Sequence, residues 1–589
     1  MNAKYTSEKH TQILIALMKK HGIKKIVASP GATNLCFLGS VQYDDDFEIY
    51  SSVDERSAAY IACGLAAESG EAVALTCTGS TASRNYLPGL TEAFYRKLPI
   101  LAITASQHFA RIGNYVPQVI DRSQQLNDIV QYSAQIDCVY TSEDEWACEL
   151  EVNKALIALK KNGGGPAHIN LRTTYSKDYS VSILPDVKVI EHIERSHNMP
   201  SLDNYKRIAI LIGVHGKWEK ELLKQVDDFC ENYNAVVLHN HASNYKGSYG
   251  VGHALIINMN KYRTSNINAD LVINMGSVSR YMSGMRKAEM WRVNPDGYIR
   301  DFEQKLTKVF QMDEKEFFQY YNSIANNRSE TKVTEYAKAW QNEYNDIISK
   351  TPELPFSNVW IAQNTINNLP ENSVLHLAGS NTARSWNFFT LPKTVECYSN
   401  DGAMGIDGQV SSLIGESLAS PNRVHIGIVG DLTFFYDMNS LGNKHIGKNF
   451  RLMIINNGKG AEFRLYSHPA AAFGDDADKY MAAAGHYGNK SPDLVRHYVE
   501  DLGYEYLSAS SKAEYQEKVE RFLETDITDK PIVFEIFTDS NDESNAIYMM
   551  NHIVQNSQAV VENMAKDVIR SIAGEKGINK IKKIVRKSK

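Results

Sequence analysis

Short apolar segments alternate with longer amphipathic segments along most of the chain. Strand-length apolar runs at residues 25–28, 73–76, 207–212 and 235–238 are followed by polar turns and then by stretches with helical spacing. The first pattern is typical of buried strands and the second of helices that cover a sheet. Their regular alternation predicts an α/β fold of mainly parallel sheets flanked by helices.

Changes in composition divide this pattern into several domains, as a chain of 589 residues leads us to expect. Prolines at positions 352 and 355 mark one boundary, after a charged helical segment at 313–350 that is expected to be a connector. We expect a first α/β domain at 1–185, a middle α/β domain with its connector at 186–350, a third α/β domain at 351–545, and a helical, basic tail at 546–589.

One strand–helix–strand unit in the third domain carries polar side chains at both strand ends. A strand-like run leads into Gly430-Asp431, a helix-like stretch covers 433–448, and a second apolar run leads into Asn456-Asn457. The carboxyl ends of parallel strands lie at the edge of the sheet where ligands bind. Asp and Asn oxygens suit Mg²⁺, which completes its octahedron with phosphate oxygens and water. Either pair alone would usually be a turn, but together they predict a site for a metal-bound diphosphate.

These two pairs together resemble the diphosphate-binding motif of the thiamine diphosphate enzymes, Gly-Asp-Gly followed at a distance by Asn-Asn. Leu432 replaces the last glycine of that motif, and residues 430–439 are most similar to the 2-succinyl-5-enolpyruvyl-6-hydroxy-3-cyclohexene-1-carboxylate synthases of the menaquinone pathway. The resemblance implies a first domain that binds the cofactor's pyrimidine and a third that binds its diphosphate. It implies thiamine diphosphate and Mg²⁺ as cofactors, with Asp431, Asn457 and the carbonyl of Lys459 as metal ligands.

The same family places an activating glutamate in the pyrimidine-binding domain. Glu55 follows a strand-like run at 47–52 and opens a helical stretch with small residues. In the family the matching glutamate bonds to the aminopyrimidine and so enables removal of the thiazolium C2 proton, which implies a catalytic role for Glu55. Gln118 lies in a segment similar to one that approaches the family's active site, and is a second catalytic candidate. Considered alone, Glu55 would be a first-turn residue favoured by the helix dipole.

Further segments match the family's cofactor-binding motifs. The stretch from Thr78 to Asn85 resembles a Gly/Ser-rich turn that offers backbone N–H groups and hydroxyls to the cofactor. Residues 398–408 match the segment around the pyrimidine, where Ile406 would hold the cofactor bent. The implied cofactor-binding residues are Ser29, Thr78, Ser80, Asn85, Gly402, Ala403, Met404, Ile406, Gly430, Asp431, Leu432, Thr433 and Asn457.

Several positions depart from the synthase branch where that branch has arginines that bind carboxylates. Asp401 replaces one arginine with a residue of opposite charge, and Thr33 and Gln107 replace two others. Loss of arginine removes bidentate carboxylate recognition, so a dicarboxylic donor is expected to bind poorly. Glu462 stands where the branch has an apolar residue, which predicts a more polar pocket. The candidate substrate residues are Gln107, Arg384, Asp401, Glu462 and Phe463.

Composition limits the remaining possibilities. The net charge of −6 gives no reason to expect a nucleic-acid partner. No apolar run is long enough to cross a membrane, and the polar start lacks a signal-peptide core. Seven scattered cysteines without a Cys-x-x-Cys pair predict reduced thiols and a cytoplasmic protein.

Together these features predict a thiamine diphosphate- and Mg²⁺-dependent 2-oxo acid decarboxylase or carboligase. Its donor would be pyruvate or another small 2-oxo acid, and its acceptor a polar molecule. Simple decarboxylation to an aldehyde and the menaquinone-pathway reaction itself are alternatives. A flavin-containing acetolactate synthase-like enzyme is disfavoured because the middle domain shows no convincing dinucleotide signature. The intact Glu55, Asp431 and Asn457 disfavour a binding protein without activity. The resemblance also implies a homodimer or homotetramer, with Glu55 from one subunit and the metal ligands from another.

Overall fold

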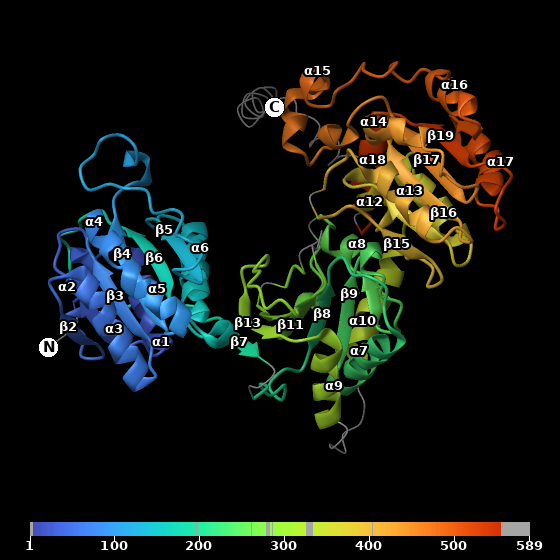
Figure 1. Ribbon diagram of the computed structural model, residues 1–589. Coiled ribbons are helices and arrows are strands. Elements are labelled where there is room, and N and C mark those ends of the chain that lie inside the picture. Colours follow the sequence, from blue (N-terminus) through green and yellow to red (C-terminus); the bar gives the residue numbers. More distant parts are fainter. Residues whose placement is uncertain are drawn as a thin grey trace, which may run out of the picture. The chain divides into compact units, whose positions relative to one another are not determined.

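A computed structural model describes residues 4–194, 198–260, 262–277, 283–285, 287–325, 334–402 and 404–554. The chain divides into two compact units, one comprising residues 1–199 and 290–312, the other residues 200–289 and 313–589. Ala403 and the predicted basic tail beyond Val554 lie outside the described residues. Three parallel sheets flanked by helices carry the fold, which confirms the predicted α/β class (Figure 1).

The first unit contains a six-stranded parallel sheet of order β2-β1-β3-β4-β6-β5. The inner strands β3 and β4 follow the apolar runs of the sequence closely, because they are buried between two helical layers, whereas all residues of the edge strand β2 are exposed. The strands are β1 (Lys25–Ala28), β2 (Glu48–Ser51), β3 (Val73–Cys77), β4 (Ile100–Ser106), β5 (Tyr132–Ile136) and β6 (Ala167–Arg172). The helices are α1 (Lys9–Lys20), α2 (Leu35–Val41), α3 (Glu55–Ser69), α4 (Thr81–Asn85), α5 (Leu87–Arg96) and α6 (Ser142–Ala158).

Alternate residues of these strands face two separate cores. Ile26 and Leu101 pack in one core with α1, α2 and α6. The next residues along the same strands, Val27 and Ala102, pack in the other core with α3 and α5. Because side chains alternate across a strand, a sheet covered on both faces needs apolar residues at consecutive positions. This explains why the strands appear as continuous apolar runs.

The middle part of the chain is also parallel α/β. Strands β10, β9, β8 and β11 pair in that order in the second unit, and β12, β13 and β7 include residues of the first. The segment expected as a connector forms two helices, of which α9 packs on α7 through Phe318 and Phe229, whose ring centroids are 5.1 Å apart. The elements are β7 (Glu191–Glu194), β8 (Ile208–Ile212), α7 (Lys220–Tyr233), β9 (Ala235–His239), β10 (Gly250–Gly252), α8 (Ala254–Ile257), β11 (Leu271–Met275), β12 (Glu289–Val293), β13 (Leu306–Gln311), α9 (Glu314–Ala325) and α10 (Glu335–Ile348).

The third sheet repeats the strand order of the first. Its order is β15-β14-β16-β17-β19-β18, so strands of the same rank occupy the same places in both sheets. Its strands are β14 (Val374–Leu377), β15 (Glu396–Tyr398), β16 (His425–Gly430), β17 (Phe450–Asn456), β18 (Glu505–Ala509) and β19 (Ile532–Phe537). Its helices are α11 (Asn358–Thr365), α12 (Asn381–Trp386), α13 (Gln409–Ala419), α14 (Asp431–Asp437), α15 (Ala477–Tyr480), α16 (Leu494–Asp501), α17 (Lys512–Phe522) and α18 (Ser540–Met550).

The helix of the diphosphate motif is shorter than its sequence pattern predicts. α14 ends at Asp437 and a 3-10 segment, Met438–Gly442, follows it in place of the expected helix to residue 448. Gly442 and Asn443 end the helical path, since glycine disfavours the helix and the Asn443 side chain accepts the N–H of His445 in a turn. The two strands still pair directly, with Gly430 opposite Ile455.

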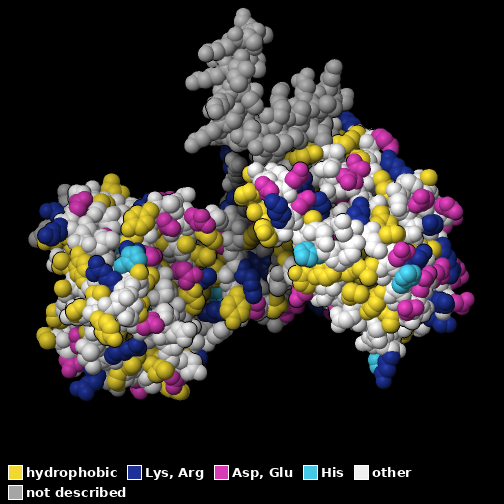
Figure 2. Space-filling view, turned by 90° about the horizontal axis from the view of Figure 1, so that it is seen from above, with side chains coloured by type: hydrophobic (Ala, Val, Ile, Leu, Met, Phe, Trp, Pro, Cys, Tyr) yellow, Lys and Arg dark blue, Asp and Glu magenta, His cyan; other side chains and the backbone are white. Residues whose placement is uncertain are grey.

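None of the helices in the described residues is long and apolar enough to span a membrane. On the face shown in Figure 2, basic and acidic side chains are interspersed over both units, as the small net charge leads us to expect. All seven cysteines are buried free thiols.

Candidate active site

Asp431 lies where β16 ends and α14 begins, and its carboxylate is buried. It accepts hydrogen bonds from the N–H groups of Leu432 at 2.9 Å and Gly458 at 2.7 Å. Burial raises the pKa of Asp431 to about 6, although these backbone hydrogen bonds oppose the shift. A buried carboxylate that lacks full compensation by the protein is suited to a cation.

Asn457 supplies a second oxygen at the same edge of the sheet. Its Oδ1 atom is buried and accepts no hydrogen bond from the residues that the structure describes. The Gly458 N–H on Asp431 brings the ends of β16 and β17 together, as parallel neighbours predict. A buried amide oxygen without a hydrogen-bond partner points to a ligand that binds there. A carboxylate, an amide oxygen and a backbone carbonyl together form a donor set that suits Mg²⁺. The residues therefore fit the implied Mg²⁺–diphosphate group.

Lys459 follows these two ligands, and only its carbonyl is available as the implied third ligand. Its ammonium donates to Asp478 Oδ2 at 2.6 Å, an ion pair that fixes the side chain away from a cation. Among the three implied metal ligands, only Asp431 supplies a carboxylate. Accordingly, the described residues contain no cluster of three His, Cys, Asp or Glu side chains of the kind that holds a metal alone.

Glu535 supports this loop and was missed by the sequence reasoning. It is fully buried on β19 and accepts hydrogen bonds from Asn456 Nδ2 at 2.7 Å and the Tyr506 hydroxyl at 2.8 Å. Burial raises the pKa of Glu535 to about 7. The first asparagine of the Asn-Asn pair is therefore a positioning residue. A lone glutamate within the apolar run 532–537 was the available signal.

Glu55 and Asn85, both singled out in the sequence, meet in the first unit. Glu55 is half-buried at the first position of α3, behind the N-cap Asp54, whose side chain accepts the Ser57 N–H. Asn85, the last residue of α4, donates its Nδ2 to Glu55 Oε2 at 3.3 Å. The glutamate is thus held in place while still reachable.

The turn after β3 is constrained by close packing. The Thr78 hydroxyl lies 2.6 Å from the Thr33 hydroxyl, and a Cβ on Gly31 would come within 2.3 Å of Thr78 Cβ, so only glycine fits there. Ser80 has a φ of 65° at the start of α4. Ser380 has a φ of 62° at the turn between β14 and α12 in the third α/β fold. A strained residue opening a helix in both repeated folds is typical of a functional turn.

The remaining expected cofactor residues lie on neighbouring turns. Ser29 is buried at the end of β1, and its N–H donates to the Thr76 carbonyl at 2.9 Å. Met404 is half-exposed with a φ of 54°, in the loop that contains Gly402 and Ile406 before α13. Leu432 and Thr433 form the first turn of α14. The structure describes each of these except Ala403.

Comparisons with known proteins agree with this geometry. Residues 8–126 match the family described as "Thiamine pyrophosphate enzyme, N-terminal TPP binding domain". The 2-succinyl-5-enolpyruvyl-6-hydroxy-3-cyclohexene-1-carboxylate synthase of Bacteroides fragilis is 30% identical, over 94% of this chain and 100% of that protein. Proteins of the same name from Phocaeicola vulgatus and Christiangramia forsetii are 29% and 28% identical, over 94% and 91% of this chain and 99% and 97% of their own lengths.

The chain belongs to the thiamine diphosphate enzyme family. It is therefore a thiamine diphosphate-dependent enzyme of lyase or transferase type, as predicted. The Bacteroides fragilis and Phocaeicola vulgatus relatives carry the same synthase name and match over nearly their full length, so the resemblance noted at residues 430–439 extends over 94% of the chain.

In this thiamine diphosphate enzyme, two of the candidate substrate residues, Asp401 and Gln107, form hydrogen bonds with neighbouring protein side chains. Asp401 is only 2% exposed and its Oδ1 accepts from the Ser399 hydroxyl at 2.8 Å. Gln107 donates to the Tyr175 hydroxyl at 3.0 Å and accepts from Arg111 Nη1 at 2.6 Å. Arg111 was not predicted, and it places a guanidinium beside the position where the synthase branch has an arginine.

Gln118 lies on the exposed loop between β4 and β5. It has a φ of 65°, and its carbonyl would be 3.3 Å from a Cβ on Gly79. The backbone of Gln118 therefore lies close to the Gly/Ser-rich turn after β3, and its catalytic role stays a prediction.

Arg384 and Glu462 form a bidentate ion pair. Arg384 Nη2 lies 2.9 Å from Glu462 Oε1, and Nη1 lies 3.1 Å from Oε2. Burial raises the pKa of Glu462, but the Arg384 hydrogen bonds and charge outweigh it and leave that pKa below its ordinary value. Sequence reasoning considered both residues but did not pair them, since 78 residues separate them.

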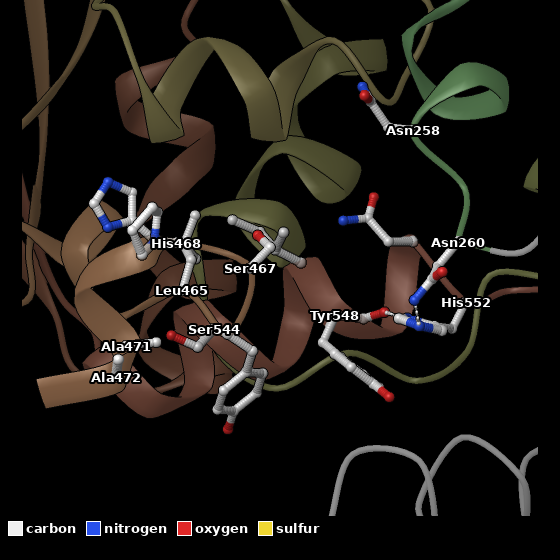
Figure 3. A pocket seen from close by; sticks show the side chains of 14 residues that line it. Asn258, Asn260, Leu465, Ser467, His468, Ala471, Ala472, Ser544, Tyr548 and His552 are labelled. Atoms are coloured by element: carbon white, nitrogen blue, oxygen red, sulfur yellow. Dashed lines mark hydrogen bonds between the residues drawn. The ribbon is translucent and has the colours of Figure 1, made fainter. Parts of the chain in front are cut away.

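A cavity of about 600 Å³ lies beside the segment that follows Asn457. Figure 3 shows His468, Ser467, Ser544 and Tyr548 around it, and the hydrogen bond between Asn260 and His552 at its rim. The His468 ring contacts Phe463 edge-on, with centroids 5.2 Å apart. The lining side chains carry no Lys, Arg, Asp or Glu: Asn258, Asn260, Leu465, Tyr466, Ser467, His468, Pro469, Ala471, Ala472, Ser544, Ile547, Tyr548, Asn551 and His552.

Proposed function

We propose that this enzyme is a thiamine diphosphate- and Mg²⁺-dependent 2-oxo acid decarboxylase that transfers the acyl carbanion equivalent to an acceptor. The observation that carries this proposal is that the buried carboxylate of Asp431 and the buried, unpartnered Oδ1 of Asn457 follow adjacent parallel strands at one edge of the sheet. Similarity over 94% of the chain to a protein whose printed name is that of a synthase supports carboligation over simple decarboxylation. Simple release of an aldehyde is the second candidate.

Each protein group has a distinct task in this proposal. Asp431, Asn457 and the Lys459 carbonyl hold Mg²⁺ and, through it, the diphosphate. Glu55, oriented by Asn85, exchanges a proton with the aminopyrimidine nitrogen. The bound cofactor supplies an electron sink that permits a 2-oxo acid to lose carbon dioxide.

The donor is proposed to be a small 2-oxo acid such as pyruvate. Arginine is absent at positions 33, 107 and 401, and Arg384 is already paired with a carboxylate. A distal carboxylate of the donor would therefore find little bidentate recognition from these positions. Arg111 beside Gln107 is the observation that favours the menaquinone-pathway reaction of the relatives, since it could bind an anionic substrate.

The acceptor is proposed to be a polar, uncharged molecule, specifically a polyhydroxylated carbonyl compound such as a keto sugar. The uncharged polar lining of the 600 Å³ cavity near Phe463 supports this class. We further propose a cytoplasmic homodimer or homotetramer, in which Glu55 and the metal ligands of each site come from different subunits.

Carbon dioxide release tests the donor and the reaction together. The holoenzyme would be incubated with pyruvate or 2-oxoglutarate, with and without a keto sugar or an aldehyde, and the products analysed. We expect a higher kcat/KM for pyruvate and a carboligation product when the acceptor is present. A higher kcat/KM for 2-oxoglutarate would contradict the donor and favour the reaction of the synthases. Aldehyde as the sole product would favour the second candidate.

A further inference from the structure

The Arg384–Glu462 ion pair lies at the edge of the third sheet where the diphosphate motif lies. Arg384 is on α12, which follows β14, and β14 pairs with β16, the strand that leads to Asp431. Glu462 comes five residues after Asn457 along the chain. The pair therefore joins the two segments that flank the proposed metal ligands.

Three donors hold the Glu462 carboxylate in this position. Arg384 Nη2 donates to Oε1, and Arg384 Nη1 and the Ser380 hydroxyl both donate to Oε2. Arg384 Nη1 also donates to Asn381 Oδ1 at 2.7 Å, which fixes the guanidinium. Ser380 is the residue with positive φ at the start of the same turn. The strained turn and the ion pair thus form one unit, which orients the guanidinium toward Glu462.

The pair remains accessible to a small molecule. The side chains of Arg384 and Glu462 are 31% and 26% exposed, so neither is sealed in a core. A planar guanidinium offers its fork to one carboxylate at a time in this geometry. Glu462 occupies the Nη1–Nη2 edge of Arg384, the edge that a ligand carboxylate needs for end-on bidentate binding.

We propose that Glu462 selects the donor by occupying Arg384, so that a second carboxylate on the 2-oxo acid meets a neutralised arginine and an adjacent negative charge. This inference deepens the proposed function and rests on it. The Glu462 carboxylate acts as an internal substitute for the carboxylate of a dicarboxylic donor. Donors with a short uncharged substituent do not need this arginine and are unaffected.

Isosteric removal of the charge tests the inference. Glu462→Gln keeps one acceptor oxygen for Arg384 and Ser380, replaces the other oxygen by an NH2 group, and leaves the guanidinium charge available. We expect kcat/KM for 2-oxoglutarate relative to pyruvate to rise roughly tenfold or more, since a charge-assisted hydrogen bond to a carboxylate is worth about 1.5–3 kcal/mol. The double variant Glu462→Gln/Arg384→Gln should lose this gain, because the freed charge is gone.

Asp475→Asn is the matched control. Asp475 also pairs with an arginine of this segment, Arg464 at 2.8 Å, but it is almost fully exposed. It should leave the donor ratio unchanged. An unchanged ratio in Glu462→Gln, an equal change in Asp475→Asn, or a gain that persists in the double variant would each overturn the inference.

A binding measurement separates this inference from the proposed function. In a Glu55→Gln background, loaded with thiamine diphosphate and Mg²⁺, 2-oxoglutarate and pyruvate would be titrated calorimetrically. Adding Glu462→Gln should tighten 2-oxoglutarate binding roughly tenfold and leave pyruvate binding unchanged. If the wild-type enzyme turns over neither acid, the proposed donor fails, while this titration still decides whether Glu462 blocks Arg384. Equal 2-oxoglutarate affinity with and without Glu462 would refute the block.

Discussion

At the scale of single residues, Asp431 is a buried carboxylate that two backbone N–H groups compensate only in part. Replacing it with alanine removes the only carboxylate among the three proposed metal ligands. We expect Asp431→Ala to raise the Kd of thiamine diphosphate in the presence of Mg²⁺ roughly 100-fold. Calorimetry of metal-stripped protein would measure it, with the exposed Asp493→Ala variant as control. Tight, Mg²⁺-independent binding by Asp431→Ala would contradict the ligand assignment.

Glu55 gives a second prediction at this scale, which separates binding from chemistry. Glu55→Gln should retain cofactor affinity, because the diphosphate and metal ligands lie elsewhere in the chain. An amide cannot take up the proton, so hydrogen–deuterium exchange at C2 of bound thiamine diphosphate should slow roughly 100-fold or more. The exposed Glu71→Gln variant of the same sheet should exchange normally. An exchange rate equal to that of the wild type would show that Glu55 is not the activator.

At the scale of elements, Glu543 joins two helices of the third α/β fold. It lies on α18, is 2% exposed, and accepts from the Asn358 N–H at the start of α11 at 3.1 Å and from the Thr538 hydroxyl at 2.7 Å. Burial raises the pKa of Glu543 from 4.5 to about 7. The folded state therefore binds this proton more tightly than the unfolded state. The stability it contributes is complete below pH 4.5 and is lost as pH rises through 7.

Glu543→Gln should therefore stabilise the protein at alkaline pH. The amide can still accept the Asn358 N–H but carries no charge to bury. We expect a gain on the order of 1 to 3 kcal/mol at pH 8 and little change at pH 5. Urea unfolding followed by tryptophan fluorescence at both pH values would measure the difference. A loss of stability of equal size at both pH values would show that the hydrogen-bond geometry, and not the buried charge, dominates.

At the scale of the whole molecule, the first and third sheets share one strand order and carry complementary halves of the proposed site. Glu55 belongs to one compact unit and Asp431 to the other. If each site combines units from two subunits, a heterodimer of Glu55→Gln and Asp431→Ala chains contains one intact site and one doubly altered site. Equal co-expression with random pairing should then restore about a quarter of wild-type activity.

The control for this complementation is each variant expressed alone, which should be inactive. Activity would be measured as carbon dioxide release, with each chain carrying a different affinity tag so that heterodimers can be purified. Purified heterodimers without activity would mean that Glu55 and Asp431 of one site come from the same chain.

The element pattern and the pairing of neighbouring strands could be predicted from the sequence. Consecutive apolar residues at 73–75 and 452–455 reflect burial on both faces, and burial of that kind is encoded locally. The end of α14 at Asp437 was less predictable, because polar helical spacing continues beyond the turn formed by Asn443. Helix ends depend on such single side-chain contacts as much as on periodicity.

The sequence by itself determined the α/β class, the cofactor family and the placement of Asp431 and Asn457 at one edge of the third sheet, because residues at the ends of adjacent parallel strands share an edge. Only the tertiary structure decided which charges meet at the candidate substrate positions. It paired Arg384 with Glu462, turned Asp401 toward Ser399 and placed Arg111 on Gln107. Such contacts follow from loop paths and side-chain directions between distant segments. No periodic pattern records them, and the electrostatics of the pocket depend on them.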